Sequence, residues 1–438
     1  ILHPSLPPTS RIKALLVYSR ALMQSDKVEK ALAVAQEVLI LCREMNHVHD
    51  MIICLNIIGG IYTRTNDFEL ALETHEQALS LSKKVNTRYG ISTSFHGIGG
   101  VHWYRGKHDE ALQAFNESLK INREIGDRKA NASILYNLGH IYQLRGEFEK
   151  ALIALREALK VNKELASIQG LTLTYNVIGF VYKDIGEYER SLQSYEKALS
   201  CAHETGSPRL IAFVLGGMGK LNWIRGDYTQ ALELLQEAIT IRKEMNDYSM
   251  LAEGYCEVSL VYQSLNRSRE AAEALEASLQ LAEAHGIKEI IGHSLAIRAR
   301  ATMIQRPSRA RHDAERSLQI WRELKNPCEE KAVHATLGLL DARDGNLEAA
   351  RVKINQAKKI IKPGGNINLY LQVLEDDITL LIMEGDVIQV EKRGQEAADI
   401  AASRGAYTAL SRIKLLQKKI QSLSAPGSTN GVHNDPDR

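Results

Sequence analysis

Apolar residues recur along this chain at intervals of three and four positions, the spacing that places them on one face of an α-helix. The stretch NLGHIYQLRGEFEKAL at 137–152 shows the recurring arrangement: a helix with Gly139 near its middle, a glycine at its end, and a second helix soon afterwards. Shifted by 40 residues, this stretch falls on VIGFVYKDIGEYERSL and, one period earlier, on GIGGVHWYRGKHDEAL. The pattern therefore predicts a repeated pair of helices.

Small residues occupy fixed positions of this unit. The first helix carries Gly59, Gly99, Gly139, Gly179, Gly219, Ser259 and Gly338. The second helix opens with Ala31, Ala71, Ala111, Ala151, Ser191, Ala231, Ala271, Ala310 and Ala350. Glycine inside a helix costs about 1 kcal/mol relative to alanine, but short side chains let two helices pack closely. We therefore expect Gly139 to lie where its helix crosses its own partner or the next helix.

Glycine and proline mark the turns between the predicted helices. Gly106, Gly146, Gly186 and Gly226 follow the first helix of successive units, and glycine tolerates the left-handed conformation that ends a helix. None of the nine prolines falls inside a predicted helix, in keeping with the cost of about 3 kcal/mol that proline carries there.

The small residues, with Tyr62, Tyr142, Tyr182 and Tyr262 three positions after the first of them, resemble the tetratricopeptide repeat. The usual unit has about 34 residues, whereas this one has 40, as in the long-helix variants of kinesin light chains, spindle-orientation G-protein regulators and bacterial signalling regulators. The resemblance implies an all-α, right-handed superhelical solenoid of about ten antiparallel helix pairs with a C-terminal capping helix.

The resemblance covers residues 10–404, and the apolar pattern and composition of the remaining residues complete a division into four parts. We expect an extended segment at 1–9, the repeat array at 10–404, a capping helix at 405–423 and a disordered tail at 424–438. The repeats near Arg298 and near Ile378 depart from the pattern, so their boundaries are less sharply defined.

Composition narrows the class of protein. Apolar residues make up 44% of the 438 positions, and the net charge of +2 gives no global electrostatic reason to expect nucleic acid or anionic membrane. No apolar run is long enough to span a bilayer. The five scattered cysteines indicate reduced, buried thiols and a cytoplasmic location. The chain starts at Ile1 without a signal peptide, which leaves open that it is part of a longer protein.

The sequence offers little catalytic chemistry. There is no HExxH zinc motif and no GxSxG motif of a serine hydrolase. The runs GIGG at 97–100 and GGMG at 216–219 lie inside predicted helices, where a packing role is favoured over phosphate binding. We therefore expect no enzymatic activity, no catalytic residues, no cofactor and no metal site.

One cluster of arginines stands out in the irregular part of the chain. It comprises Arg298, Arg300, Arg306, Arg309, Arg311 and Arg316. A solvated, irregular turn is the favoured interpretation, and an anionic docking patch is the alternative, which would weaken with rising salt.

A partner-binding stripe is predicted on the first helices, at positions −3, +1 and +4 from the first small residue. In tetratricopeptide proteins this face usually forms the concave groove, so the resemblance implies candidate peptide contacts. The candidates are Asn56, His96, Trp103, Tyr136, His140, Gln143, Asn176, Phe180, Lys183, Lys220, Trp223 and Gln263. Such a mixture of amide, aromatic and cationic groups suits recognition of a peptide. The alternative is that individual members merely pack against the neighbouring repeat.

These observations favour a non-enzymatic interaction scaffold that binds an extended or helical segment of another protein. A second hypothesis is the sensory arm of a larger bacterial signalling protein, such as a nucleotide-switch ATPase or a peptide-responsive regulator. A third hypothesis, an enzyme, would require an acid, a base and a pocket near Arg298.

Overall fold

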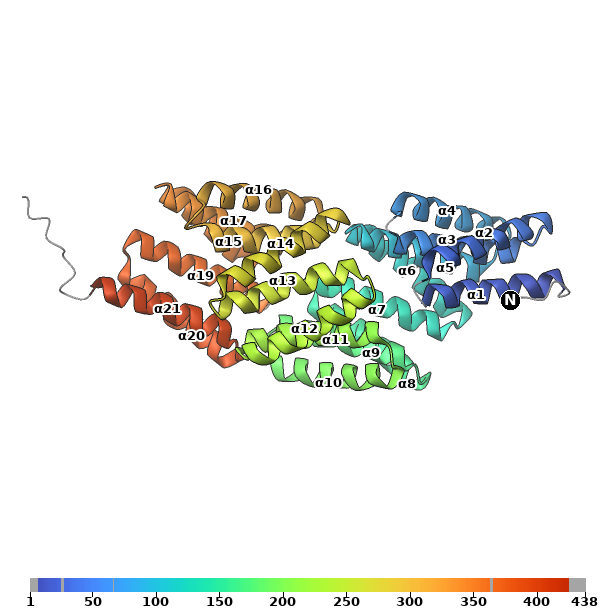
Figure 1. The fold of residues 1–438 in the computed structure, drawn as a ribbon, viewed down its shortest axis with the longest axis horizontal. Coiled ribbons are helices and arrows are strands. Elements are labelled where there is room, and N and C mark those ends of the chain that lie inside the picture. Colours follow the sequence, from blue (N-terminus) through green and yellow to red (C-terminus); the bar gives the residue numbers. More distant parts are fainter. Residues whose placement is uncertain (1–6, 25–26, 66, 363–364, 425–438) are drawn as a thin grey trace, which may run out of the picture. The chain divides into compact units, whose positions relative to one another are not determined.

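The computed structural model describes residues 7–24, 27–65, 67–362 and 365–424. Residues 1–6 of the expected N-terminal segment and 425–438 of the expected tail therefore lie outside the described residues. Within this part the chain forms 21 helices and no strand (Figure 1). They divide into two compact units, Ile1–Val177 and Ile178–Arg438. The prediction of ten helix pairs followed by one more helix is confirmed.

The first unit contains eight complete helices and the start of a ninth. They are α1 (Pro8–Gln24), α2 (Val28–Glu44), α3 (Val48–Arg64), α4 (Phe68–Lys84), α5 (Arg88–Tyr104), α6 (His108–Ile125), α7 (Arg128–Leu144), α8 (Phe148–Glu164) and α9 (Ile168–Asp184). Helix α1 begins two residues before the expected start of the array.

The second unit contains the end of α9 and twelve further helices. They are α10 (Tyr188–Thr205), α11 (Pro208–Arg225), α12 (Tyr228–Glu244), α13 (Tyr248–Ser264), α14 (Ser268–Ala284), α15 (Lys288–Thr302), α16 (Pro307–Glu323), α17 (Pro327–Arg343), α18 (Leu347–Ile360), α19 (Ile367–Glu384), α20 (Val387–Arg404) and α21 (Tyr407–Ser424). The repeats near Arg298 and Ile378 are thus helix pairs like the others.

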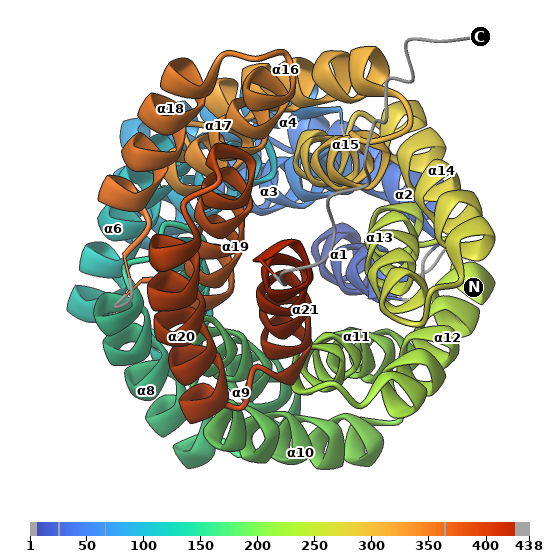
Figure 2. The same cartoon turned by 90° about the vertical axis from the view of Figure 1, so that its left-hand side faces the viewer.

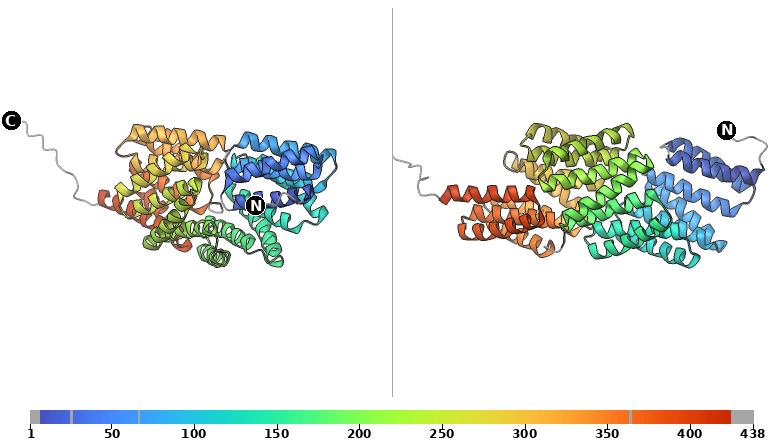
Figure 3. Two further views of the ribbon diagram at one scale, coloured as in Figure 1. Left: turned by 45° about the vertical axis from the view of Figure 1, so that its right-hand side comes forward. Right: turned by 90° about the horizontal axis from the view of Figure 1, so that it is seen from below.

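Within each unit the helices stack side by side in chain order (Figure 3). The first helix of each repeat has an odd number, and several first helices also contact the first helix of the next repeat. These contacts join α1, α3 and α5 in the first compact unit, and α11, α13, α15, α17 and α19 in the second. In the second unit these first helices lie on the inner side, and α10, α12, α14, α16 and α18 lie on the outer side (Figure 2). A surface lined by first helices is therefore available in each unit.

Gly139 lies where α7 crosses its own partner helix, α8. A Cβ atom on Gly139 would meet Cγ of Leu155 at 2.5 Å and the carbonyl oxygen of Ala151 at 3.3 Å. The equivalent glycines Gly59 and Gly179 face the rings of His75 and Tyr195 in the same way. Each glycine thus leaves room for a large side chain from the partner helix, which explains its place in a helix.

The two glycine runs serve packing between repeats. GIGG lies within α5 and GGMG lies within α11. A Cβ atom on Gly97 would meet the His75 ring at 2.2 Å, and one on Gly217 would meet the Tyr195 ring at 2.7 Å. Each ring is therefore held between a glycine of its own repeat and a glycine of the next.

The predicted turn glycines adopt the left-handed conformation. Gly106, Gly146, Gly186 and Gly226 have φ angles of 68°, 73°, 81° and 83°. This conformation strains other residues but costs glycine little, so each residue ends a first helix where the sequence indicates.

Helix α21 contacts more of the second unit than the pair it follows. It packs on α19 and α20, and it also contacts α11, near the start of the same unit (Figure 2). The Thr408 hydroxyl donates to the carbonyl of Trp223 and lies 3.2 Å from the Tyr228 hydroxyl. Nearby, the Tyr188 hydroxyl donates to Oδ1 of Asn368 at 3.1 Å. The last helices of the second unit therefore close onto its first repeats.

Candidate functional site

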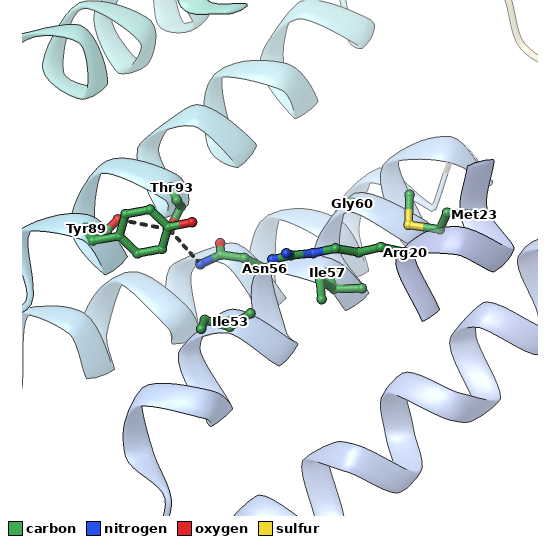
Figure 4. A pocket seen from close by; sticks show the side chains of 8 residues that line it. All are labelled: Arg20, Met23, Ile53, Asn56, Ile57, Gly60, Tyr89 and Thr93. Atoms are coloured by element: carbon green, nitrogen blue, oxygen red, sulfur yellow. Dashed lines mark hydrogen bonds between the residues drawn. The ribbon is translucent and has the colours of Figure 1, made fainter. Parts of the chain in front are cut away.

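A pocket opens on the first-helix surface of the first unit, between α1, α3 and α5 (Figure 4). Its volume is about 290 Å³. Its lining consists of Arg20, Met23, Ile53, Asn56, Ile57, Gly60, Tyr89 and Thr93. No acidic side chain is among these residues, so the lining carries one positive charge.

Asn56 forms one wall of this pocket and is held by hydrogen bonds. Its amide nitrogen donates to the Ile52 carbonyl at 3.1 Å, to the Thr93 hydroxyl at 3.3 Å and to the Ser94 hydroxyl at 3.1 Å. Its amide oxygen lies 2.9 Å from Nδ1 of His75. This candidate contact therefore joins α3 to α4 and α5, and its amide is already engaged within the protein.

Arg20 is the charged group of the pocket. It is exposed, and it has no hydrogen-bond or ion-pair partner among the residues that the structure describes. Its side chain extends from α1 across the pocket toward Asn56 (Figure 4). The chain thus leaves a guanidinium, with its five N–H donors, available beside an apolar surface.

The stripe could have revealed two of the pocket residues had it been extended by one repeat. Ser19 lies 40 residues before Gly59 and takes its place as the small residue, so Arg20 and Met23 occupy the +1 and +4 positions. Ile53 and Thr93 lie one helical turn before the −3 position. Tyr89 lies a further turn back on α5.

Five candidate contacts gather on α5 and α7 of the first unit, and all five are half-buried. They are His96, Trp103, Tyr136, His140 and Gln143. The Trp103 ring packs edge-on against His140 with centroids 5.2 Å apart, and Tyr136 lies 6.2 Å from His140. Nε2 of His96 accepts from the Asn137 amide at 3.2 Å. These side chains form a partly exposed aromatic surface that also packs neighbouring repeats together.

The prediction that Asn176 is an accessible contact of the stripe is wrong. None of its surface is exposed, and neither amide atom has a hydrogen-bond partner among the described residues. The surrounding helices separate it from solvent, so it does not belong to the accessible surface.

The second unit holds five of the candidate contacts, and of these Lys183 alone is buried. Phe180 lies edge-on between Tyr195 and Phe213. The prediction that Lys183 is an accessible contact is also wrong, because its surface is only 6% exposed. Its ammonium lies 3.1 Å from Asp184 and 5.4 Å from the Phe180 ring centre. Burial lowers the pKa of Lys183. This lysine is therefore an internal group.

Three further candidates of the second unit are half-buried: Lys220, Trp223 and Gln263. The Lys220 ammonium lies 3.5 Å from Glu257. Nε1 of Trp223 donates to the Ser264 hydroxyl of the next first helix at 2.8 Å. Both stripe tryptophans, Trp103 and Trp223, thus contact the adjacent repeat.

The arginine cluster pairs largely with carboxylates of the chain. Arg298 contacts Asp313 through two hydrogen bonds of 2.7 and 2.9 Å. Arg300 lies 2.8 Å from Asp376, and Arg311 lies 2.9 Å from Asp341. Arg316 similarly contacts Glu283 at 2.8 Å. Only Arg306 and Arg309 of this cluster are exposed without a partner among the described residues. The cluster is thus mostly neutralised from within.

The described residues form neither a metal site nor a membrane-spanning helix. No group of three or more His, Cys, Asp or Glu side chains is placed to hold a metal ion there. In that same part of the chain, no helix is both long and apolar enough to cross a bilayer. All five cysteines are free; Cys42, Cys54 and Cys256 are buried, and the other two are half-buried.

Comparison of sequences gives one consistent match. A family model described as Tetratricopeptide repeat matches residues 90–164, 171–244 and 214–284, and a second model of the same description matches residues 55–89. No curated protein matches this chain.

Several solved structures share the fold. A Rap protein complexed with competence and sporulation factor has a TM-score of 0.64 and 13% identity, over 84% of this chain and 100% of that chain. NprR in complex with its cognate peptide NprX has a TM-score of 0.58 and 17% identity, over 80% of this chain and 99% of that chain. The apo form of the quorum sensor NprR from B. thuringiensis has a TM-score of 0.53 and 18% identity, over 80% and 99%. At these identities the similarity concerns the fold.

Proposed function

The chain belongs to the tetratricopeptide repeat family, and we propose that it is a non-enzymatic, peptide-responsive regulator. In this proposal the first-helix surface of the first unit binds a peptide or a segment of another protein. The observation that carries it is the pocket between α1, α3 and α5, beside the guanidinium of Arg20, which has no partner among the described residues. The solved complexes of Rap with competence and sporulation factor and of NprR with the peptide NprX support the choice of ligand class.

The dimensions of the pocket favour a peptide over a larger small molecule. Pockets for drug-sized ligands usually range from about 300 to 1,000 Å³, and this one, at about 290 Å³, is at the lower limit. It suits one or two anchoring side chains of a longer ligand. The remainder of such a ligand would lie along the first helices, where Trp103, Tyr136 and His140 present partly exposed rings. Buried aromatic anchors often dominate the binding energy of a peptide.

The proposal also specifies the kind of partner and the place of action. The near-zero net charge favours a protein or peptide over nucleic acid. The arginine cluster gives no reason to propose an anionic partner, because Arg298, Arg300 and Arg311 form ion pairs within the chain. Five free cysteines favour the reducing cytoplasm. The chain acts either as a free-standing scaffold or as the sensory arm of a larger signalling protein.

Tyr89 provides the test of this proposal. Its ring lines the pocket and is 47% exposed, so Tyr89→Ala removes contact area at little cost in packing. The ligand is a peptide selected on the wild type from a synthetic library of short random peptides. We expect the variant to bind it about tenfold more weakly, which corresponds to about 1.4 kcal/mol, because an aromatic contact is lost. Fluorescence polarisation of the labelled peptide measures the affinity.

Tyr248→Ala is the matched control, because Tyr248 is similarly exposed but lies in the second unit. It should bind the peptide as the wild type does. The proposal fails if no library peptide binds the full chain, or if Tyr89→Ala binds with unchanged affinity.

A further inference from the structure

We propose that Glu253 and Glu329, on the inner surface of the second unit, bind the two ammonium groups of an aliphatic diamine. This inference goes beyond the proposed function, because the candidate peptide pocket lies in the first unit. It follows from the charges that gather on this inner surface, from two carboxylates that lack a partner, and from a buried hydroxyl that also lacks one.

The first helices on the inner side of the second unit carry charged side chains that act on one another (Figure 2). The Lys220 ammonium on α11 lies 3.5 Å from Glu257 on α13. Burial raises the pKa of Glu329 on α17 to about 7, and Lys220 opposes this change. Burial also lowers the pKa of His293 on α15 to about 3, with a smaller contribution from Lys220. Since one ammonium acts on groups of three other helices, these side chains face a common space.

Carboxylates outnumber ammonium groups around this space. The ammonium groups are both engaged in ion pairs, which are Lys183–Asp184 and Lys220–Glu257. Glu253 and Glu329 are half-buried, and neither carboxylate has a hydrogen-bond or ion-pair partner among the described residues. A carboxylate removed from water without a partner is costly. The space therefore favours a ligand with two positive charges.

The ionisation of Lys220 reflects this excess of negative charge. Burial lowers the pKa of this ammonium group, but the nearby carboxylates, chiefly those of Glu257 and Glu253, outweigh burial and raise the pKa above its usual value. Arg242 is a further cation close to Glu257, and its two terminal nitrogens already donate to backbone carbonyls. A cationic ligand would thus meet a favourable field.

A buried hydroxyl provides an independent indication of a ligand. Tyr195 is fully buried, and its hydroxyl has no hydrogen-bond partner among the described residues. The ring passes Gly217 of α11, where an added Cβ atom would lie 3.2 Å from the hydroxyl oxygen. Burial raises the pKa of Tyr195, and the charges of Asp184 and Glu257 add to this effect. The hydroxyl therefore extends toward the same carboxylates and can accept a hydrogen bond from a ligand ammonium group.

A linear diamine suits these features better than a metal ion or a monoamine. A metal ion takes several ligands close together, and no group of three or more such side chains exists among the described residues. A monoamine would leave either Glu253 or Glu329 without a partner. A diamine carries an ammonium group at each end, and its N–H donors can serve both carboxylates and the Tyr195 hydroxyl.

The test measures binding of putrescine, a linear aliphatic diamine, to the full chain by isothermal titration calorimetry. We expect Glu253→Gln and Glu329→Gln each to weaken binding at least about tenfold, the usual effect of losing a charge-assisted hydrogen bond. Tyr195→Phe keeps the buried ring and should weaken binding at least about fivefold, because it removes one acceptor. Glu237→Gln is the matched control and should bind as the wild type does, since Glu237 is exposed on the outer helix α12.

The pH dependence of binding is a readout that a purely structural role of Glu329 would not produce. The Glu329 carboxyl has a pKa of about 7 because burial and the charge of Asp184 raise it more than Lys220 lowers it. A bound ammonium group favours the ionised form of this carboxyl. The affinity of the wild type should therefore rise about tenfold between pH 6 and pH 8, and Glu329→Gln should lose this rise.

Each of three outcomes would overturn the inference. Binding of butylamine, the monoamine of the same length, as tightly as putrescine would show that the two carboxylates do not act together; this comparison uses the wild type alone and does not depend on the folding of any variant. Unchanged affinity in both Glu253→Gln and Glu329→Gln would place the diamine elsewhere. Absence of binding at millimolar putrescine would show that the inner surface holds no diamine site.

Discussion

Replacing Arg298 by methionine is expected to destabilise the second unit by about 3–5 kcal/mol, because it leaves a buried carboxylate without its partner. Asp313 is 2% exposed and receives two hydrogen bonds from Arg298, which also lies 3.1 Å from Glu276. Removing the arginine would leave the Asp313 charge uncompensated. The loss of stability is measured by urea denaturation that is monitored by circular dichroism.

Two variants identify the cause of this loss. Adding Asp313→Asn to Arg298→Met should recover part of the stability, since it removes the unpaired charge. Arg309→Met should change the free energy of unfolding by no more than about 0.5 kcal/mol, as expected for an exposed residue that contacts no charged partner in the described part of the chain. An unchanged urea midpoint for Arg298→Met would show that the ion pair does not stabilise the fold. An anionic docking patch would then be the better explanation of this arginine cluster.

The first unit should lose stability in acid through His75. This side chain is 2% exposed, and burial, with a smaller contribution from His96, lowers its pKa from 6.5 to about 4. The groups near it include the Asn56 amide, Gly59 and Gly97, none of which ionises, and the His96 imidazole, whose own pKa burial lowers to about 4. Because the unfolded state binds a proton more readily, stability is complete above pH 6.5 and falls as the pH decreases toward 4. At about 1.36 kcal/mol for each pKa unit, the loss is about 3 kcal/mol.

His75→Phe isolates this contribution. Phe115 occupies the same position of the next repeat, where it packs against Gly99, so a phenylalanine ring suits the site. We expect the difference in free energy of unfolding between His75→Phe and the wild type to shift by about 3 kcal/mol in favour of the variant between pH 7 and pH 4. A difference that stays constant over this range would show that His75 does not titrate on unfolding.

The helix pairs could be predicted from the sequence because they depend on local, repeated signals. Gly139 and its equivalents permit close packing, and Gly146 and its equivalents supply the left-handed turns. Both signals recur every 40 residues and need no knowledge of distant parts of the chain.

The candidate site was only partly predictable, because exposure depends on packing between repeats. The stripe contains Asn56 of the pocket, yet it also contains Asn176 and Lys183, which the folded chain buries. Periodicity assigns a face to each residue but does not show whether a neighbour covers that face. Arg20 and Met23 follow the same register in the first repeat, where Ser19 replaces the glycine that marks it.

The interpretation of the arginine cluster depended on contacts that periodicity does not reveal. Arg300 pairs with Asp376, 76 positions further along the chain. Helix α21 similarly reaches Trp223 through Thr408, 185 positions apart. Such long-range contacts follow from the closure of the second unit, which no single repeat encodes.

Hydrogen exchange of the full chain, with and without a peptide selected from the library of short random peptides, tests the central claim most directly. The claim is that the first-helix surface of the first unit binds a peptide. It predicts slower exchange in α1, α3 and α5 when the peptide is present at a concentration near its Kd for the wild type, and a much smaller change in Tyr89→Ala at that concentration. Slower exchange confined to the second unit, with α1, α3 and α5 unchanged, would contradict it.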